Sequence, residues 1–316
     1  MQICIVGDPE DLSAAYVAWL AERRGAEVLT LPEDRLGLDW TFRVAGSDGA
    51  IEAGDNTYDL RAIAGAFVRL NRRPAVDEAL GVPVDLEHVY AIERRHGIQW
   101  LLDEAPFPVV NRPSSGRANG SKPFQMAELT AAGLCVPRWV VTNDVGRAHA
   151  FLESCPDGAV YKSCSGLRSH VRRADGRLLE RLAAGTAPVV LQEYVGGSEV
   201  RVHVVGTETF GTAVSSAALD YRFDSEQNEY TAADVPPDVA RMCVEAARRE
   251  RLVLAGLDFR VSPDRSWWCL ELNPVPTFLP YEAGSGHAIG EAILDVLIGQ
   301  EPRGRRPSRL AAITEP

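Results

Sequence analysis

Hydrophobic positions in residues 1–110 follow two periods in alternation. Short, mostly apolar runs predict buried strands, and longer stretches with apolar side chains three or four residues apart predict amphipathic helices. The predicted strands are Gln2–Val6, Ala26–Leu31 and Gly65–Leu70, with a hairpin over Thr41–Ala53. The predicted helices are Asp11–Arg24 and Leu86–Leu102. Strands and helices in alternation indicate a small α/β domain over residues 1–110.

Residues 111–300 begin with a polar loop and then mix helices with hairpins. The predicted helices are Lys122–Ala132, Asp144–Ser154, Pro237–Arg251 and Ala288–Ile298. The predicted strands are Arg138–Thr142, Ala159–Lys162, His170–Arg173, Val189–Tyr194, Glu199–Val205 and Thr209–Ser216. Residues 301–316 are rich in Pro and Arg and are predicted to form a flexible tail.

Two neighbouring segments near the C-terminus, Gly256–Val261 and Trp267–Pro274, predict an antiparallel hairpin. Folding the chain back between them puts six apolar side chains on one face, in the pairs Leu257 with Leu272, Phe259 with Leu270, and Val261 with Trp268. The other face carries Asp258 opposite Glu271, with Asn273 two residues further on. Two carboxylates this close repel unless a cation lies between them, and Mg²⁺ prefers oxygen ligands. The hairpin is therefore either a cation site or an ordinary hairpin whose polar face meets solvent.

Composition and charge exclude several classes of function. A chain of 316 residues with 46% hydrophobic and 24% charged residues is typical of a soluble globular protein with two or three subdomains. The net charge of −11 argues against a nucleic-acid partner, and no apolar run approaches a membrane span. The chain start lacks the basic region of a signal peptide, and the six cysteines form no Cys-x-x-Cys pair. We therefore expect a cytoplasmic protein with reduced thiols and no zinc site.

The strand that ends at Lys162 is followed by a small polar loop, Ser163–Ser169, which suits a polyphosphate. The ammonium group supplies charge, and loop N–H groups and hydroxyls can donate to phosphate oxygens. An ordinary exposed loop would have the same composition. The chain contains neither the Walker A pattern nor the glycine fingerprint of dinucleotide-binding domains, and the second absence argues against an NAD enzyme.

The apolar strand Val189–Tyr194 runs into a glycine pair and can present backbone groups to an adenine edge. Glu199 could then bind a ribose hydroxyl, and it shares one face of the next strand with Arg201. Arg222 is a second arginine near this sheet, and two guanidinium groups can bind phosphoryl oxygens by forked hydrogen bonds. A Glu–Arg pair facing solvent explains the first pattern equally well.

Taken in order along the chain, these pieces resemble the RimK-like branch of the ATP-grasp superfamily, the ATP-dependent carboxylate–amine ligases. The stretches that carry the resemblance are Asn119–Lys122, Val136–Asn143, Tyr161–Ser163, Leu191–Val195, Glu199–Gly206 and the hairpin through Pro274. The resemblance implies a pre-ATP-grasp α/β domain over residues 1–110. A bilobal α+β ATP-grasp fold would follow, with a central lobe over residues 111–195 and a C-terminal lobe over residues 196–300.

The resemblance also implies a role for each candidate residue around ATP. Phosphates would be bound by Lys122, Lys162 and the loop residues Ser163, Ser165, Gly166 and Arg168. Adenine would be lined by Gln192, Glu193, Tyr194 and Val195, and ribose would be held by Glu199. Mg²⁺, with Mn²⁺ as the alternative cation, would be bound by Asp258, Glu271 and Asn273. The transferred phosphoryl group or acyl phosphate would be faced by the catalytic residues Arg201 and Arg222.

The implied reaction converts a carboxylate into an acyl phosphate with ATP and then couples it to an amine, releasing ADP and phosphate. The substrates are either small amino acids or a peptide tail, or side chains of a ribosomally made precursor peptide that closes into ester or amide rings. A nucleotide-binding module without catalysis is the remaining alternative, and a homo-oligomer is left open. Two departures from the family concern the phosphate loop, which has one glycine, and the segment after Asn273–Pro274, which lacks a glycine.

Overall fold

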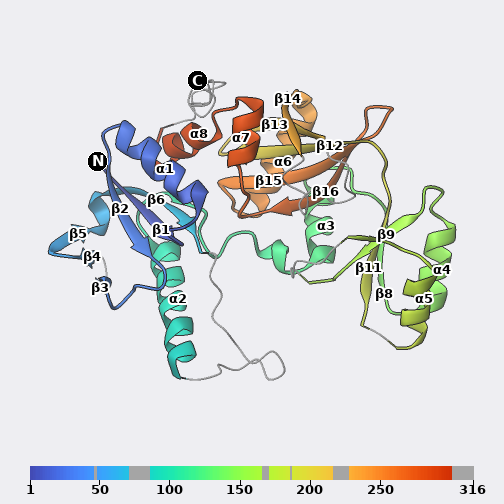
Figure 1. The fold of residues 1–316 in the computed structure, drawn as a ribbon, viewed down its shortest axis with the longest axis horizontal. Helices are drawn as coiled ribbons and strands as arrows, with labels where there is room; N and C mark the ends of the chain where they lie inside the picture. Colours follow the sequence, from blue (N-terminus) through green and yellow to red (C-terminus); the bar gives the residue numbers. More distant parts are fainter. Residues whose placement is uncertain (46–47, 71–85, 166–170, 186, 216–227, 301–316) are drawn as a thin grey trace.

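A computed structural model of the protein describes residues 1–45, 48–70, 86–165, 171–185, 187–215 and 228–300. Three larger β-sheets lie along the molecule, and the C-terminal sheet lies between the N-terminal and central sheets (Figure 1). Each of these sheets falls within one of the three predicted units. The predicted tail, residues 301–316, is outside the described residues.

The N-terminal unit is an α/β layer around a parallel sheet with strand order β2-β1-β6-β7. Its strands are β1 (Gln2–Gly7), β2 (Glu27–Pro32), β6 (Ile63–Arg69) and β7 (Val109–Val110), and its helices are α1 (Leu12–Arg23) and α2 (Leu86–Glu104). The predicted hairpin is present as β3 (Trp40–Ala45) and β4 (Asp48–Ala53), and β5 (Asn56–Asp59) extends it to three strands. A 3-10 turn, Leu60–Ala62, precedes β6, and a second one, Arg117–Gly120, precedes α3 of the central unit.

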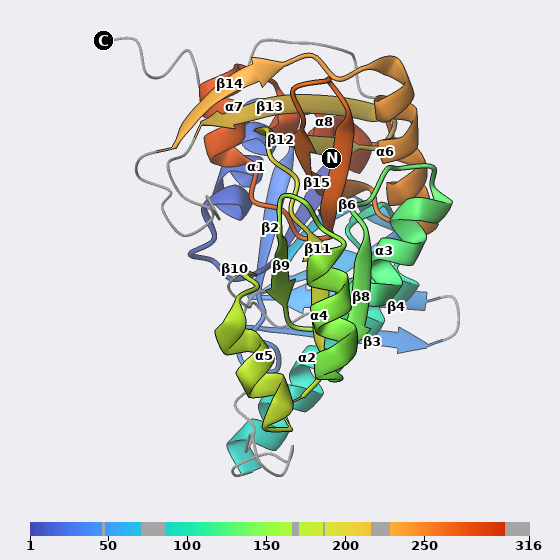
Figure 2. The ribbon, with the colours of Figure 1, turned by 90° about the vertical axis from the view of Figure 1, so that its right-hand side faces the viewer.

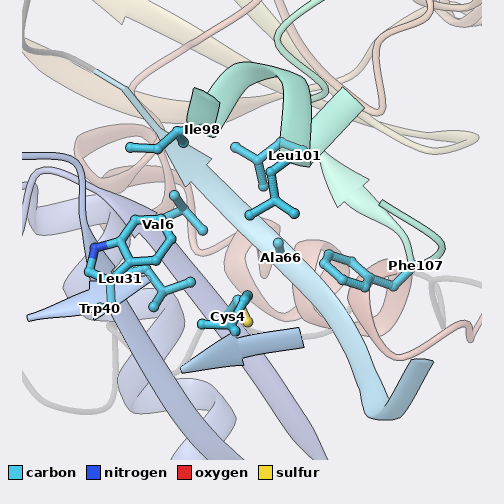
Figure 3. Close-up of a pocket in the computed structure, with 10 residues that line it drawn as sticks. Cys4, Val6, Leu31, Trp40, Ala66, Ile98, Leu101 and Phe107 are labelled. Atoms are coloured by element: carbon cyan, nitrogen blue, oxygen red, sulfur yellow. The ribbon is translucent and has the colours of Figure 1, made fainter. Parts of the chain in front are cut away.

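A second feature of the N-terminal unit is its own apolar core beneath α2. Figure 3 shows aromatic and aliphatic side chains around a small cavity in this core, including Trp40 and Phe107. The cavity is lined only by apolar side chains and cysteine, among them Cys4, Ala66 and Ile98, so it is a packing gap rather than a ligand site.

The central unit is an antiparallel sheet with strand order β10-β9-β11-β8. Its elements are α3 (Lys122–Ala131), β8 (Trp139–Thr142), α4 (Val145–Glu153), β9 (Ala159–Lys162), β10 (Arg172–Arg173), α5 (Gly176–Ala183) and β11 (Val189–Glu193). Helices α4 and α5 bury Ala148, Leu178 and Leu182 against Leu191, so they cover one face of this sheet. Helix α5 was not predicted from the sequence, although its N-cap Asp175 accepts from the backbone N–H of Leu178.

The C-terminal unit is a five-stranded antiparallel sheet with strand order β14-β13-β12-β15-β16. Its elements are β12 (Ser198–Val205), β13 (Glu208–Ser215), β14 (Glu229–Ala233), α6 (Pro237–Arg249), β15 (Leu254–Val261), β16 (Trp267–Asn273), α7 (Leu279–Ser285) and α8 (Ile289–Leu297). Helix α6 covers one face and buries Cys243 and Ala246 against Val202 and Leu257. The opposite face is apolar near α7 and α8 and polar toward the central unit, where the candidate site lies.

Helix α8 joins the C-terminal unit to the N-terminal unit, where it lies beside α1 (Figure 1). Ile293 and Leu297 are fully buried in the same apolar cluster as Val17 and Leu20. Arg24, which caps α1, forms ion pairs with two acidic side chains of α8. One continuous core therefore fixes the two units against each other. No helix in the described ranges has the length and apolar character required to cross a membrane.

The observed register of the β15–β16 hairpin confirms two of the predicted residue pairs and corrects two others. Leu257 pairs with Leu272 and Asp258 with Glu271, as predicted. A β-bulge then shifts the register, so Phe259 pairs with Cys269 instead of Leu270, and Val261 pairs with Trp267 instead of Trp268. Cys269 is fully buried against the α6 side, whereas Trp268 and Leu270 are only half-buried. All four residues from Trp267 to Leu270 are apolar, so alternation of polarity could not reveal the extra residue.

Candidate active site

Helix α3 connects the central and C-terminal sheets through one face that carries Lys122, Gln125 and Met126, all buried. Lys122 Nζ donates to Glu271 Oε1 at 2.7 Å. The Gln125 side chain exchanges two hydrogen bonds with the backbone of Leu272, at 2.7 and 3.2 Å. Met126 Sδ accepts from Gln192 Nε2, on the central sheet, at 3.7 Å. These contacts bring the ends of β11 and β16 to the same helix. Lys122 was predicted as a site residue from the sequence, whereas Gln125 and Met126 were not, although residues three and four positions apart share one face of a helix.

The polar face of the C-terminal sheet carries a row of charged side chains across three strands, with two carboxylates between two cations. Arg201 on β12 lies opposite Asp258 on β15, and Asp258 lies opposite Glu271 on β16. Arg201 Nη1 donates to Asp258 Oδ1 at 2.6 Å, and Lys122 completes the row at Glu271. Each carboxylate is therefore held by a cation whose side chain is at most 10% exposed. This surrounding positive charge stabilises two carboxylates that would otherwise repel each other.

Gly256 provides the space for the Arg201 guanidinium. A Cβ atom at this position would lie 2.4 Å from Arg201 Nη2 and 2.6 Å from both Cζ and Nε. Gly256 lies opposite Asn273 in the hairpin and next to Asp258, so the absent side chain lets the guanidinium lie flat over the strand. Any larger residue here would force the Arg201 guanidinium to shift, a constraint that was not predicted from the sequence.

The donor set of the hairpin suits a hard divalent cation. Asp258 and Glu271 offer carboxylate oxygens from directly opposed positions, and Asn273 offers an amide oxygen. Asn273 Oδ1 already accepts from the Val275 N–H at 2.9 Å, which orients the amide while leaving a lone pair. Mg²⁺ commonly takes one or two protein carboxylates and fills its remaining positions with water and phosphate oxygens. Among the described residues, no group of three or more His, Cys, Asp or Glu forms a further metal-binding arrangement.

Lys162 is the second buried lysine of the candidate site and lies at the end of β9 in the central sheet. Its side chain is buried, and Nζ donates to Gln192 Oε1 at 3.0 Å on the neighbouring strand. The loop after Lys162 starts next to α3, because the Lys122 N–H donates to the Cys164 oxygen at 2.9 Å and Ser165 forms a bridge with Ser121. Two lysines and the start of the loop are therefore brought together. The predicted phosphate-binding residues Gly166 and Arg168 lie outside the described residues, as does the predicted catalytic residue Arg222.

Two side chains of the segment predicted to line adenine, Glu193 and Tyr194, contact neighbouring arginines. Glu193 accepts from Arg138 Nε and Nη2 at 2.9 and 3.0 Å, and these hydrogen bonds lower the pKa of the Glu193 carboxyl group. The Arg173 guanidinium lies 3.4 Å from the Tyr194 ring centroid, a cation–π contact. Val195 is half-buried. A nucleotide base would therefore meet this segment mainly through its backbone and the buried Gln192.

The predicted ribose ligand Glu199 is paired with Arg260, which lies directly opposite on β15. Arg260 Nη1 also donates to the Gly197 oxygen at 3.0 Å, so one arginine fixes both the turn after β11 and the Glu199 carboxylate. Arg260 was not predicted as a site residue. Its position two residues after Asp258 puts it on the same face of the strand, and this spacing could have indicated it.

His203 lies on β12, two residues beyond Arg201 on the same face, and is fully buried. Its ring meets the Tyr281 ring edge-on at 4.9 Å, and Nε2 is 3.1 Å from the Thr277 oxygen. Because a carbonyl can only accept, Nε2 carries the proton and donates. Burial, and to a lesser extent the charge of Arg201, lowers the pKa of the His203 imidazole to about 3.

We expect His203 to make folding stability depend on pH. Its pKa falls from 6.5 in the unfolded chain to about 3 in the fold, so the unfolded chain binds more protons between these values. Its contribution is therefore fully present above about pH 6.5 and decreases as the pH falls. Lowering the pH from about 7 to about 5 should cost about 2 kcal/mol of unfolding free energy. Urea unfolding at both pH values checks this, and an equally pH-dependent His203→Phe variant would contradict it.

Several solved structures are similar to this chain over nearly its whole length. An ATP-grasp ligase, PsnB, complexed with a phosphomimetic variant of its minimal precursor, Mg and ADP, is 28% identical. The TM-score is 0.76, and the match covers 94% of this chain and 98% of PsnB. The macrocyclase MdnC from Microcystis aeruginosa MRC, bound with the precursor peptide MdnA, is 21% identical with a TM-score of 0.76, covering 95% of this chain and 100% of MdnC. D-alanine–D-alanine ligase from Bacillus anthracis, complexed with ATP, is 15% identical with a TM-score of 0.59, covering 94% and 95%.

No family model and no curated protein sequence matches the chain. The structural matches nevertheless define the class: the chain has the ATP-grasp fold, preceded by an α/β domain, and its structural neighbours are ATP-grasp ligases. This confirms the predicted fold class and superfamily.

Proposed function

We propose that the protein is an ATP- and Mg²⁺-dependent ligase that activates a carboxylate of a peptide substrate and joins it to an amine or hydroxyl group. The observation that carries the proposal is the row of Arg201, Asp258, Glu271 and Lys122, together with the buried Lys162, whose partner Gln192 contacts Met126 on the helix that carries Lys122. Three charged side chains on the C-terminal sheet, with one lysine on α3 and another on the central sheet, suit the polyphosphate of ATP and a bridging cation.

The proposed chemistry has two displacement steps. A carboxylate oxygen of the substrate attacks the γ-phosphorus of ATP, the bond to the β-phosphate oxygen breaks, and an acyl phosphate and ADP form. The amine or hydroxyl group then attacks the acyl carbon and loses its proton, while the carbon–oxygen bond to phosphate breaks. Inorganic phosphate leaves, and an amide or ester remains.

In this proposal each residue acts through charge and position. Lys122 and Lys162 bind phosphate oxygens, and Arg201 stabilises charge on the transferred phosphoryl group. Asp258, Glu271 and Asn273 would hold Mg²⁺, which neutralises phosphate charge when bound. Arg260 keeps Glu199 in place for the ribose, and the buried Lys162–Gln192 pair fixes the start of the phosphate loop.

A peptide substrate is favoured over small amino acids by the comparisons. PsnB is complexed with a minimal precursor and matches over nearly the full length of both chains, whereas D-alanine–D-alanine ligase has the lower TM-score of 0.59. We therefore favour the hypothesis of side-chain ester or amide rings in a precursor peptide. The stretches that resemble the RimK-like branch support placing the protein in that branch of the superfamily.

The test is a product assay with the full chain. Purified protein, ATP and Mg²⁺ are incubated with a panel of acids, amines and peptides encoded beside the gene. We expect ADP and phosphate in equal amounts, and a peptide whose mass falls by one water for each ring. Adding hydroxylamine should divert the acyl phosphate to a hydroxamate. Formation of AMP and pyrophosphate would overturn the acyl-phosphate mechanism, and nucleotide binding without turnover on any substrate would favour a non-catalytic module.

A further inference from the structure

Both carboxylates of the metal-binding hairpin are ion-paired within the chain. Lys122 Nζ donates to Glu271 Oε1 at 2.7 Å, and Arg201 Nη1 donates to Asp258 Oδ1 at 2.6 Å. The proposed function gives the two cations other partners, the phosphate oxygens of ATP, and gives the two carboxylates another partner, the divalent cation. The protein and its ligands therefore use the same four groups.

These ion pairs lie in a poorly solvated part of the site. Side-chain exposure is 10% for Lys122, 19% for Glu271, 4% for Arg201 and 13% for Asp258. Water screens such charges less than charges on an open surface, so each of them acts strongly on its neighbours. A divalent cation that approaches the carboxylates must therefore also approach the two positive groups beside them.

The charges of this row sum to zero. Two carboxylates are balanced by one ammonium and one guanidinium group. A divalent cation without nucleotide would leave an excess of positive charge at a place that water screens poorly, which is unfavourable. A polyphosphate supplies the missing negative charge, because its oxygens can bind the ammonium and guanidinium groups while the carboxylates bind the metal.

The two cations differ in their freedom to change partner. The Arg201 guanidinium is confined, because it lies against Gly256 and its Cζ atom is 5.8 Å from the Tyr281 ring centroid. Lys122 is fixed through its backbone at the start of α3. Beyond its Cα atom, a flexible stem can turn the ammonium group from Glu271 to a phosphate oxygen. Lys122 is therefore the cation that can change partner with the smaller rearrangement.

We infer that the site accepts the metal–nucleotide complex but excludes the free cation, because Lys122 neutralises Glu271 until a phosphate oxygen takes over its ammonium group. The inference rests on the proposed function and gives Lys122 a second role, in which its charge keeps a metal without nucleotide away from the ligands. Nucleotide and cation then raise each other's affinity by the same factor, since coupling between two binding events is reciprocal. We expect a factor of about a hundred, within the usual range of such couplings.

The decisive variant is Lys122→Gln, which keeps a polar side chain and removes the charge. Its affinity for Mn²⁺ in the absence of nucleotide should rise about tenfold, because an opposite charge beside a carboxylate changes its affinity for a proton by at least this factor and a metal ion responds in the same direction. Lys122→Arg keeps the charge and should bind Mn²⁺ alone as weakly as the wild type. Equilibrium dialysis against MnCl2 measures both, after circular dichroism has shown that the variants are folded.

Two controls locate the gain in affinity. The double variant Lys122→Gln/Glu271→Gln lacks the released carboxylate, so the gain should disappear. Arg249→Gln removes a positive charge from a different ion pair of α3, in which Arg249 Nη2 lies 2.9 Å from Glu128 Oε2. It changes the net charge as much as Lys122→Gln does and should leave Mn²⁺ binding unchanged.

The wild type gives a measurement that depends on no variant. With ADP it should retain Mn²⁺ in dialysis, whereas with adenosine, which brings no phosphate, or without any nucleotide, its affinity for Mn²⁺ should be about a hundredfold lower. Equal retention of Mn²⁺ with and without ADP would overturn the inference, because the cation would then need no phosphate to bind.

The outcomes separate the inference from the proposed function. If the wild type neither binds Mg·ADP nor converts any substrate, the proposed function fails and the inference fails with it. If the wild type converts a substrate but Lys122→Gln gains no affinity for Mn²⁺ alone, only the inference is overturned. A gain that persists in the double variant would also overturn it, because the cation would then bind away from Glu271.

Discussion

The Asp258→Asn substitution should lower ligase activity by a factor of at least about a thousand. Asparagine keeps the shape and one oxygen but removes the charge that would balance a divalent cation. It also removes the charged acceptor to which Arg201, whose side chain is 4% exposed, donates at 2.6 Å. The affinity for Mg·ADP should fall with activity, because in the proposed site the cation and the nucleotide bind together at this face.

Two measurements keep this result interpretable. Leaving Arg201 without its carboxylate should cost about 3 kcal/mol of stability, so circular dichroism must first show that the variant is folded at the assay temperature. Asp238→Asn, on the exposed surface of α6, is the matched control and should behave like the wild type. Wild-type metal–nucleotide affinity in both Asp258→Asn and Glu271→Gln would show that this hairpin is not the cation site.

The Gly256→Ala variant should lower kcat about a hundredfold, because misplacing a catalytic group by about an ångström has an effect of this order. The added methyl would lie 2.4 Å from Arg201 Nη2, so the guanidinium must move away from Asp258. The change adds one carbon and removes no charge, so the effect isolates the position of Arg201. We expect the KM for ATP to change less than kcat, since the lysines remain in place.

Gly176→Ala is the control for this prediction, because a Cβ at Gly176 meets nothing within 4 Å and the residue lies on α5 away from the row of charges. Steady-state kinetics with saturating ATP, together with thermal unfolding, separate catalysis from stability. A Gly256→Ala enzyme with wild-type kcat would show that Arg201 does not act on the transferred phosphoryl group.

Much of the fold could be predicted because its elements carry local signals. The helix that starts at Lys122 was predicted with its N-cap, since Ser121 accepts from the Phe124 N–H as a capping serine should. The Asp258–Glu271 pair was predicted because two strands joined by a short turn have few registers that keep apolar residues on one side. Helix α5 was missed despite its Asp175 cap and its two leucines four residues apart.

The candidate site could be predicted only where its residues share an element or a hairpin. Arg260 and Gly256 lie beside Asp258 on β15 but act on groups of β12: Arg260 pairs with Glu199, and Gly256 leaves room for Arg201. Neither role is visible without the strand pairing, which joins residues more than fifty positions apart. The bulge that replaces Leu270 by Cys269 in the core is likewise decided by packing against α6.

The sequence by itself determined most of the strands and helices and the pairing of the two carboxylates, because periodicity and turn chemistry act over a few residues. The tertiary structure alone decided which of these groups meet. It placed Lys122 on Glu271 and Gln192 on Met126 through one face of α3, and it bound the Asn273–Thr277 segment to three distant side chains. Such contacts depend on how apolar faces pack in three dimensions, and no spacing along the chain encodes them.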